Sequence, residues 1–501
     1  MKKYVIVFIL FCVVGFTYIL LTQKYKDELP AVVANPHFVS IKDKRFSLDG
    51  KPFYPVSVNY IVSLKGDSND IWPSPYVDYN PKFNNQTKDS CLLYLRAELE
   101  SIKNMGFNSI RVVGIGETSA KDRAKKLQGI RVENGKSDFT LMLSDSSNYK
   151  KYFNALQELF DITNEVGLKI VLLIHVDPNL EYTENHLAAL ASRFKNDPVL
   201  MAYDLYNEPL YFDTIQRYKT DVYQITKRWN RILKKNAPNQ LSTIGLEGVR
   251  EVFEWDPNIL DVDFLSMHPY EYEPEQVRNE TYWYGTYIKK PWIIGETSLP
   301  ADNDSVSYEE QRLFVKKTLR QVLNCGSWGY TWWQYKDVHW HEFHSDYMGI
   351  MSRRGNTKTS INNFSISGIP KPASEEFKKF DYTKKMDSCI CLSNYYNYSS
   401  LNKFRIIGKL TDAHSGMPIQ GGVVMAWDEY WTYSFHTISK ADGSFELYSK
   451  FPYYHWMASA TEYTMVRGNI SPDTAKLSDA KIPTINIGNL KLDKVDLRPF
   501  E

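Results

Sequence analysis

The chain has 501 residues, of which 43% are hydrophobic, and its 60 Lys and Arg nearly balance its 59 Asp and Glu. This length accommodates two or three globular domains. The formal net charge of +1 leaves no basic excess, which argues against a nucleic-acid partner.

The first predicted element is an N-terminal signal anchor over residues 1–28. Lys2 and Lys3 precede an apolar run from Tyr4 to Leu21, which has the length of the shortest membrane-spanning helices. No small-residue cleavage site follows the run directly. We therefore expect a membrane-anchored protein whose remainder is exported to the periplasm or cell surface. The alternative is a cleaved signal peptide and secretion.

Strand-like and helix-like segments alternate over residues 36–383. The expected strands are 51–60, 108–113, 168–176, 201–207, 241–248, 262–270, 292–296 and 328–335. The expected helices are 92–105, 152–166, 184–194, 214–236, 308–325 and a closing helix at 371–380. Alternation of this kind predicts a parallel sheet, and eight strands fit a closed (β/α)8 TIM barrel of the α/β class. A glycine-rich nucleotide motif does not follow the first strand, which disfavours a dinucleotide-binding fold.

Two of these strands end in a glutamate, Glu208 and Glu296. Ala202, Asp204, Tyr206 and Glu208 occupy every second position and therefore share one face of the strand. Glu208 is expected to face the barrel interior. Retaining glycoside hydrolysis needs such a pair, because one carboxyl group protonates the leaving oxygen and the other attacks the sugar carbon. Glu247, at the end of the strand 241–248, is a rival carboxylate with an expected supporting role.

The C-terminal part of the chain differs in character. Residues 384–402 are rich in Ser, Asn and Tyr and predict a linker, and short β-rich runs broken by turn signals over 403–501 predict a small all-β sandwich. Five cysteines form no disulfide framework. We expect free thiols at Cys389 and Cys391, with a strained disulfide between them as the alternative.

Three segments carry a family resemblance: FSLDGKPFYP at 46–55, RFKNDPVLMAYDLYNEP at 193–209 and IIGET at 293–297. They resemble the first strand, the acid/base strand and the nucleophile strand of the family 5 glycoside hydrolases, which are retaining, clan A, cellulase- and mannanase-like enzymes. The resemblance implies that Glu208 is the acid/base, that Glu296 is the nucleophile and that neither a metal nor an organic cofactor is needed. It also implies substrate-binding roles for Arg111, His175, Asn207, His268, Tyr270 and Trp333, with Trp332 as the substitute for Trp333.

The chemistry of these residue types agrees with the implied roles. Arg111 and Tyr270 can stabilise an ionised nucleophile through charge-assisted hydrogen bonds. A neighbouring negative charge raises the pKa of the acid/base, which then keeps its proton. The alternatives are that the two histidines are core residues and that Arg111 is a structural ion-pair partner. The run 339–344 (HWHEFH) lacks the HExxH spacing and predicts a loop after the last strand rather than a metal site.

Aromatic residues outside the barrel strands are candidate sugar platforms. The segment 72–75 and the pair Trp283 and Tyr284 are expected either to stack on sugar rings or to pack in loops. In the C-terminal part, Trp427, Tyr430, Trp431 and Tyr433 lie close together. They could bind glycan, although some are expected in the core and the rest against the barrel.

The C-terminal part resembles the carboxypeptidase regulatory-like sandwich domain, which implies a β-sandwich without chemistry of its own. The positions that carry the resemblance are Gly408, Asp412, Gly416, Pro418, Ile419, Asp442, Gly443 and Phe445. The predicted function of the whole chain is double-displacement hydrolysis of a β-linked glucan- or mannan-type glycan. The alternatives are an exo-acting clan A β-mannosidase or β-galactosidase and an inactive glycan-binding barrel.

Overall fold

The structure is a computed structural model that describes residues 37–67, 69–76, 87–115, 117–119, 127–133, 138–361, 364–384, 387–397, 403–477 and 482–500. The predicted signal anchor at 1–28 lies outside these residues. Within the described part of the chain, every helix is too short or too polar to cross a bilayer.

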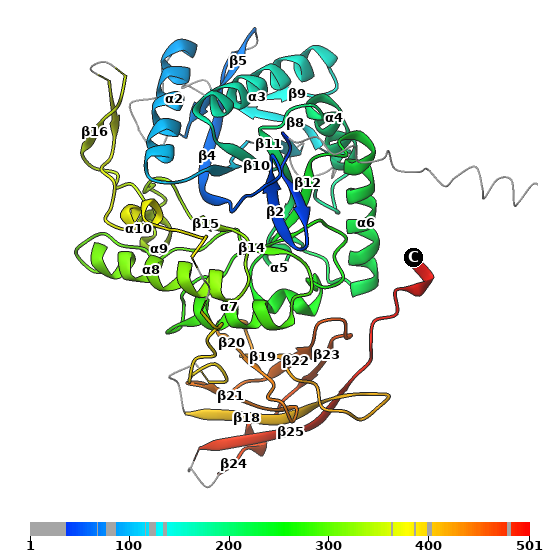
Figure 1. Cartoon of the computed structure of the whole chain (residues 1–501). Helices are drawn as coiled ribbons and strands as arrows, with labels where there is room; N and C mark the ends of the chain where they lie inside the picture. Colours follow the sequence, from blue (N-terminus) through cyan, green and yellow to red (C-terminus); the bar gives the residue numbers. More distant parts are fainter. Residues whose placement is uncertain are drawn as a thin grey trace, which may run out of the picture.

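Eight parallel strands close into a barrel, which confirms the predicted (β/α)8 architecture (Figure 1). The last strand pairs with the first, so that Trp332 lies opposite Val58. In chain and barrel order the strands are β4 (Val56–Gly66), β6 (Ser109–Val113), β10 (Lys169–Leu173), β11 (Leu200–Asn207), β12 (Leu241–Leu246), β13 (Leu265–Met267), β14 (Trp292–Ile294) and β15 (Tyr330–Trp332).

Helices surround the barrel and alternate with its strands. The long ones are α2 (Lys88–Asn104), α3 (Ser146–Val166), α4 (Thr183–Phe194), α6 (Lys219–Asn236), α7 (Gln276–Tyr287) and α8 (Tyr308–Asn324). The short ones are α5 (Pro209–Phe212), α9 (Phe343–Asp346), α10 (Ser374–Lys378) and the 3-10 helices η3 (Val249–Phe253), η4 (Pro472–Thr474) and η5 (Arg498–Phe500). Capping residues determine where several helices begin or end. Ser307 and Glu310 form a capping box before α8, and Gly167 ends α3 with a φ of 80°.

Helix α7 was not predicted from the sequence, and α6 begins later than predicted. The predicted helix 214–236 begins only at Lys219, and a separate short helix, α5, opens at Pro209. Helix α7 has no clear apolar stripe, since residues on several of its faces are buried, among them Gln276, Val277 and Asn279. A helix buried on several sides lacks the amphipathic period that reveals surface helices.

Small sheets complete the barrel. A three-stranded sheet of β1 (Ser40–Lys42), β2 (Arg45–Leu48) and β3 (Lys51–Pro52) supplies Phe46, whose ring meets Phe264 at 5.1 Å. Phe46 joins Val171, Met201 and Ile293 in one buried cluster. The remaining strands are β5 (Ile71–Pro75), β7 (Glu117–Ser119), β8 (Leu127–Val132), β9 (Phe139–Met142), β16 (Asn356–Lys358) and β17 (Ser365–Ser367).

The C-terminal part contains two four-stranded sheets, which lie below the barrel in Figure 1. One sheet is formed by β18 (Phe404–Asp412), β21 (Ser444–Ser449), β24 (Lys476–Leu477) and β25 (Pro483–Leu492). The other is formed by β19 (Val423–Trp427), β20 (Ser434–Ile438), β22 (His455–Ser459) and β23 (Val466–Asn469). Ile406, Val424, Phe445 and Leu447 belong to the apolar core of this part.

The second sheet packs directly on the barrel. Val423, Met425 and Ile438 belong to the same apolar cluster as the barrel core. A buried ion pair reinforces this junction, because Lys219 Nζ lies 2.9 Å from Asp256 Oδ2 and also donates to the carbonyl oxygen of Ala460 at 2.9 Å. The position of the C-terminal sheets is therefore fixed by both apolar and polar contacts.

The aromatic pair before β14 belongs to this junction and not to a sugar platform. Trp283 and Tyr284 are both buried, and the indole Nε1 of Trp283 donates to the carbonyl oxygen of Gly421 at 2.8 Å. The packing alternative therefore holds for both residues.

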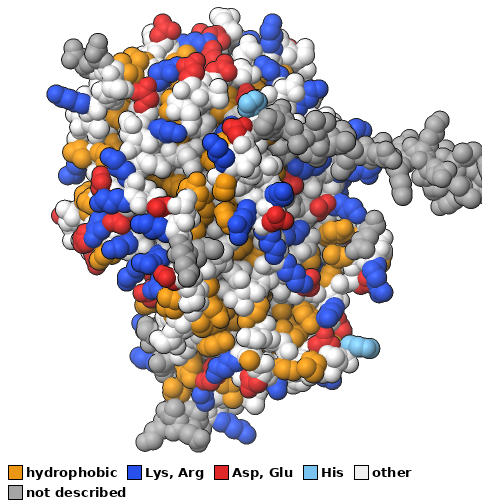
Figure 2. Space-filling view, viewed as in Figure 1, with side chains coloured by type: hydrophobic (Ala, Val, Ile, Leu, Met, Phe, Trp, Pro, Cys, Tyr) orange, Lys and Arg blue, Asp and Glu red, His pale blue; other side chains and the backbone are white. Residues whose placement is uncertain are grey.

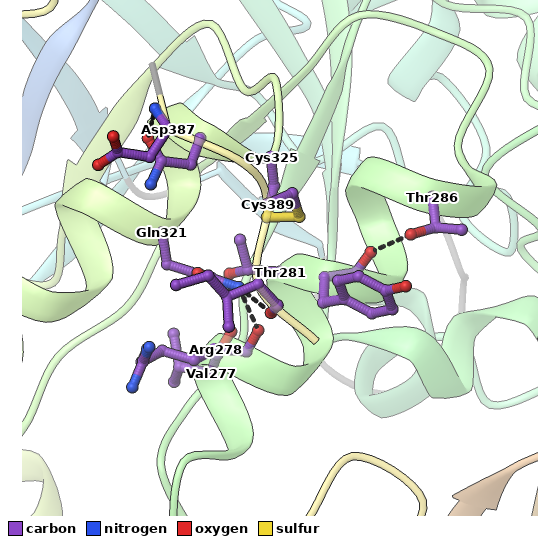
Figure 3. The surroundings of a disulfide bond; sticks show 11 residues. Val277, Arg278, Thr281, Thr286, Gln321, Cys325, Asp387 and Cys389 are labelled. Atoms are coloured by element: carbon purple, nitrogen blue, oxygen red, sulfur yellow. Dashed lines mark hydrogen bonds between the residues drawn. A yellow bond between two sulfur atoms is a disulfide. The ribbon is translucent and has the colours of Figure 1, made fainter. Parts of the chain in front are cut away.

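The prediction of a free thiol at Cys389 is wrong. Cys389 forms a disulfide with Cys325, which directly follows α8 (Figure 3). Beside it, Gln321 Nε2 donates to the carbonyl oxygen of Ile390 at 2.8 Å. Cys391 keeps an exposed free thiol. The two cysteines are 64 positions apart, and sequence spacing alone could not reveal that they pair. The bond attaches the predicted linker to the barrel.

Removing this disulfide is expected to destabilise the protein. Cys325→Ser should lower the free energy of unfolding by about 2–4 kcal/mol, because the bond closes a long loop and restricts the unfolded chain. Denaturant unfolding under non-reducing conditions measures the change. The matched control is Cys391→Ser, which removes an exposed thiol and should leave stability unchanged. Equal stabilities of the two variants would contradict this account.

Candidate active site

Glu208 lies at the carboxyl end of β11, where the chain turns into α5. Its backbone has a φ of 43° and a ψ of 68°, and its amide donates to the carbonyl oxygen of Gly245 at 2.8 Å. Pro209 follows as the first residue of α5. Catalytic residues of eightfold barrels are built at these strand ends.

The predicted alternation along β11 is wrong near its end. Asp204 contacts Arg111 as expected, but Tyr206 stacks on Trp255 with ring centroids 5.6 Å apart, among the outer helices and loops. The pairing register with β12 shifts between Asp204 and Asn207. Such an irregularity moves the following side chains to the other face, so Asn207 and not Tyr206 points to the barrel interior.

Glu296 is buried two residues beyond β14 and accepts two hydrogen bonds from charged or polar donors. The Tyr270 hydroxyl donates to Glu296 Oε2 at 2.7 Å, and Arg111 Nη1 donates to Glu296 Oε1. Both bonds favour the ionised carboxylate. The contact with Glu296 makes Arg111 an ion-pair partner and also places it in the site, so the two interpretations of Arg111 coincide.

Arg111 is buried beneath the site and contacts more than one acidic group. Its Nε donates to Asp204 Oδ2 at 2.8 Å, and its terminal nitrogens donate to Asn59 Oδ1 at 2.8 Å and to Asn207 Oδ1 at 2.7 Å. The guanidinium therefore orients the side chain of Asn207 and holds a fixed positive charge beside Glu296. Asn59 was not among the predicted site residues, because it belongs to no motif that marks it in the sequence.

His268 lies between the two glutamates. Its Nδ1 is 3.0 Å from Glu208 Oε1 and 3.7 Å from Glu296 Oε1, and its Nε2 is 3.2 Å from Ser266 Oγ. Burial lowers the pKa of His268 to about 4, so the ring is neutral at pH 7. A neutral imidazole can donate a hydrogen bond to an ionised Glu208 or accept one from a protonated Glu208. It adds no second positive charge to the site.

Two glycines make room for this histidine ring. A Cβ atom at Gly245 would lie 2.4 Å from His268 Cε1, and one at Gly295 would lie 1.7 Å from Ser266 Oγ and 2.8 Å from His268 Nε2. All three contacts are shorter than packed atoms tolerate. The glycine before Glu296 in the IIGET segment is therefore needed for packing at the site.

The two glutamates face one another across a short gap. One carboxylate oxygen of Glu208, one of Glu296 and the Nδ1 of His268 all lie within 4.8 Å of one another. In the described residues, this is the only group of three or more acidic, His or Cys side chains with metal-like spacing, and the 339–344 loop contributes to none. Arg111 already supplies a positive charge to Glu296, so a cation there would meet electrostatic repulsion.

The environments of the two carboxyl groups differ. Burial and, to a smaller extent, the charge of Glu247 raise the pKa of Glu208 to about 8. Burial also raises the pKa of Glu296, but the positive charge of Arg111 and the hydrogen bond from Tyr270 oppose that rise. Since Glu296 receives the Arg111 and Tyr270 bonds, the proton shared by this pair is better placed on Glu208.

Trp333 and Trp332 differ in how deeply they are buried. Trp333 is half-buried, and its amide donates to the carbonyl oxygen of Thr297, next to Glu296, at 3.0 Å. Trp332 is fully buried against Phe314 of α8 and Phe377 of α10, with ring centroids about 6 Å away. Trp332 is therefore packed against the outer helices, which leaves Trp333 as the candidate residue for the site.

His175 and Glu247 have other neighbours. The ring of His175 meets the aromatic rings of Tyr206 at 4.4 Å and Phe212 at 5.7 Å. Glu247 forms an ion pair with Arg250 and lies 3.5 Å from the Tyr211 hydroxyl. Glu247 thus supports the site and does not meet Glu296.

Comparison with known proteins finds one family model that is similar to part of the barrel. Residues 94–338 match the model of the cellulase family, glycosyl hydrolase family 5. No curated protein sequence matches the chain.

Solved structures give more distant similarities. A glycoside hydrolase family 5 mannosidase from Rhizomucor miehei is 15% identical with a TM-score of 0.43, and the alignment covers 63% of this chain and 94% of that one. A GH5_18 protein from Streptomyces cattleya in complex with GlcNAc is 15% identical with a TM-score of 0.44, covering 72% and 85%. A β-glucuronidase from Ruminococcus gnavus is 16% identical with a TM-score of 0.43, covering 68% of this chain and only 51% of its own. Similarities this distant say nothing about the substrate of this chain.

Proposed function

We propose that this chain, whose residues 94–338 form a glycoside hydrolase domain of family 5, hydrolyses β-glycosidic bonds with retention of configuration. The observation that carries the proposal is the gap of at most 4.8 Å between a carboxylate oxygen of Glu208 and one of Glu296. Retaining enzymes hold their carboxyl groups about 5–5.5 Å apart, whereas inverting enzymes need about 6.5–9.5 Å to admit a water molecule.

The chemistry assigns one role to each glutamate. Glu296 Oε attacks the anomeric carbon and forms a glycosyl ester while Glu208 transfers its proton to the leaving oxygen. Glu208, now ionised, removes a proton from a water molecule that attacks the same carbon and releases Glu296. His268 stabilises Glu208 in both protonation states, because its Nδ1 lies within hydrogen-bond distance of the carboxyl group.

The surrounding residues position the sugar in this proposal. Asn207, oriented by Arg111, is placed to contact a sugar hydroxyl beside Glu208. Trp333 presents a half-buried indole as the floor of the site. His175 and His268 complete the substrate-binding set that the family resemblance implies. The proposed substrate is a β-linked glucan or mannan, since the resemblance is to cellulase- and mannanase-like enzymes.

We also propose that the enzyme is exported, with membrane attachment through the segment at 1–28. The apolar run in that segment supports export. The Cys325–Cys389 disulfide supports it as well, because such bonds persist mainly in oxidising compartments.

The reaction itself is tested with aryl β-glycosides of glucose, mannose, xylose and galactose. The wild-type chain should hydrolyse at least one of them, and proton NMR of the first product should show the β-anomer before mutarotation. An α-anomer as first product would reject the retaining mechanism. Inertness toward all four sugars and toward soluble β-glucan and β-mannan would reject the hydrolase.

The activity is also expected to depend on pH in a defined direction. The active form of the free enzyme has a protonated Glu208 and an ionised Glu296, so kcat/KM should fall as the pH rises through about 8, the pKa of Glu208. Glu247→Gln removes a negative charge that raises this pKa. The descending limb of the pH profile should therefore move to lower pH in that variant.

The control for this experiment is Glu309→Gln. Glu309 is an exposed residue of α8 that pairs with Arg312, and it is not among the charged residues that shift the pKa of Glu208. Its pH profile should match that of the wild type. A descending limb that stays in place or moves to higher pH in Glu247→Gln would contradict the proposed electrostatic role of Glu247.

A further inference from the structure

Two adjoining cavities follow the junction between the barrel and the C-terminal sheets. The first, of about 210 Å³, is lined by the segment after Glu208, by η3 and by sandwich residues that include Trp427 and Trp431. The second, of about 440 Å³, continues toward Val495. Gln216, Met465 and Arg467 line both, and Arg467 Nη1 donates to Gln216 Oε1 at 2.9 Å. We call the two cavities together the junction groove.

An aromatic stack forms one wall of the junction groove. Trp431 lies on Trp427 with ring centroids 4.3 Å apart and an interplanar angle of 28°, and Trp427 lies in turn on His455 at 5.6 Å. Trp427 is 8% exposed, whereas Trp431 is 58% exposed. Figure 2 shows hydrophobic side chains gathered over the lower part of the molecule, where the C-terminal sheets lie. A flat, supported and exposed indole suits the apolar face of a sugar ring.

The backbone holds Trp431 in this exposed position at a conformational cost. Its φ of 59° is unusual for a bulky residue. Asp428 closes the turn, because its Oδ1 accepts from the amide of Tyr433 at 2.9 Å and its own amide donates to the carbonyl oxygen of Tyr433 at 3.1 Å. An exposed tryptophan in such a turn adds little to the core, which points to an external ligand.

Polar groups line the same cavity beside the aromatic wall. The indole nitrogen of Trp255 is buried, and it has no hydrogen-bond partner among the described residues. Asp213, Arg250 and Glu254 add charged donors and acceptors. Aromatic platforms combined with a few hydrogen-bonding groups are typical of sites for polar, ring-shaped ligands such as saccharides.

The junction groove adjoins the proposed catalytic pair. Pro209 and Leu210, which directly follow Glu208, line its first cavity. Arg250 lines it too and pairs with Glu247, whose charge acts on Glu208. We propose that the junction groove binds sugar residues of the polysaccharide substrate outside the catalytic cleft, with Trp431 as the stacking platform. The identity of the glycan rests on the proposed function, but the site does not require catalysis.

Binding to uncut polysaccharide tests this inference. The full chain with Glu296→Gln, which should not hydrolyse, is run on native gels that contain soluble β-glucan or β-mannan. At least one polysaccharide should retard it. Adding Trp431→Ala should weaken that binding about tenfold, the loss expected for roughly 1.4 kcal/mol of stacking.

The matched control adds Tyr430→Ala instead, which removes a neighbouring aromatic ring that is 78% exposed and lines neither cavity. This control should bind as the Glu296→Gln parent does, and equal thermal unfolding of the three proteins shows that the fold is retained. Equal retardation with and without Trp431 overturns the inference, as does the absence of any retardation.

These outcomes remain separate from those of the hydrolase test. A wild type that cleaves aryl glycosides, together with either negative result, rejects the junction groove alone. An inert wild type with Trp431-dependent retardation rejects the hydrolase alone.

Discussion

Glu296→Gln is expected to reduce kcat by about 10⁴- to 10⁶-fold, the range seen when a covalent nucleophile is removed. The amide keeps the size of the carboxylate, so it can still occupy the space beside Tyr270 and Arg111, but it cannot form the glycosyl ester. Hydrolysis of the best aryl β-glycoside measures the loss.

A covalent readout separates this role from simple positioning. Wild-type protein treated with a 2-deoxy-2-fluoro glycoside carrying a good leaving group should gain the mass of one glycosyl unit, and the labelled peptide should contain Glu296. The Glu296→Gln variant should gain none. The exposed Glu309→Gln variant serves as the control and should behave as the wild type in both assays. A label on Glu208 or Glu247 would refute the assigned nucleophile.

Arg111→Met is expected to have the largest effect on stability. The substitution leaves Asp204 and Glu296 buried without their shared cation, which typically costs about 3–5 kcal/mol of unfolding free energy. Denaturant unfolding at neutral pH measures the loss. The loss should diminish in acid, because the two orphaned carboxylates can then bind protons in the folded state.

An exposed ion pair provides the comparison for this variant. Arg131 pairs with Asp138, and the two side chains are 60% and 42% exposed. Arg131→Met should therefore change stability by only about 0–1 kcal/mol. If Arg111→Met were no more destabilising than Arg131→Met, the buried charge cluster would not be a structural feature of the fold.

The buried charges around Arg111 explain how the two glutamates of the site can differ in protonation state. Burial raises the pKa of both Glu208 and Glu296. The donors are distributed unequally, since Arg111 and Tyr270 serve Glu296 whereas Glu208 meets a neutral His268. Two carboxyl groups in one cavity can thus hold one proton and one negative charge, as general acid and nucleophile require.

Periodicity and motif in the sequence were enough to predict the barrel. The alternation of strands with amphipathic helices has few compact solutions, and the parallel strands place their carboxyl ends at one face. Glu208 and Glu296 could therefore be expected near each other although 88 positions separate them. The resemblance to family 5 supplied their proposed roles.

Contacts between distant segments were decided only by the tertiary structure. The shift in β11 that turns Asn207 inward and Tyr206 outward depends on pairing with β12 and breaks the simple alternation. The Cys325–Cys389 bond and the burial of Trp283 depend on docking of the segments after the barrel.

The sequence by itself determined the local propensities, the order of strands and helices, and the residues at the strand ends. The tertiary structure alone decided which side chains face one another, because side-chain direction follows from strand register and packing across the chain. The same reason applies to the junction groove, since its walls come from the segment after Glu208 and from the turn at Trp431, which meet only when the barrel and the C-terminal sheets pack together.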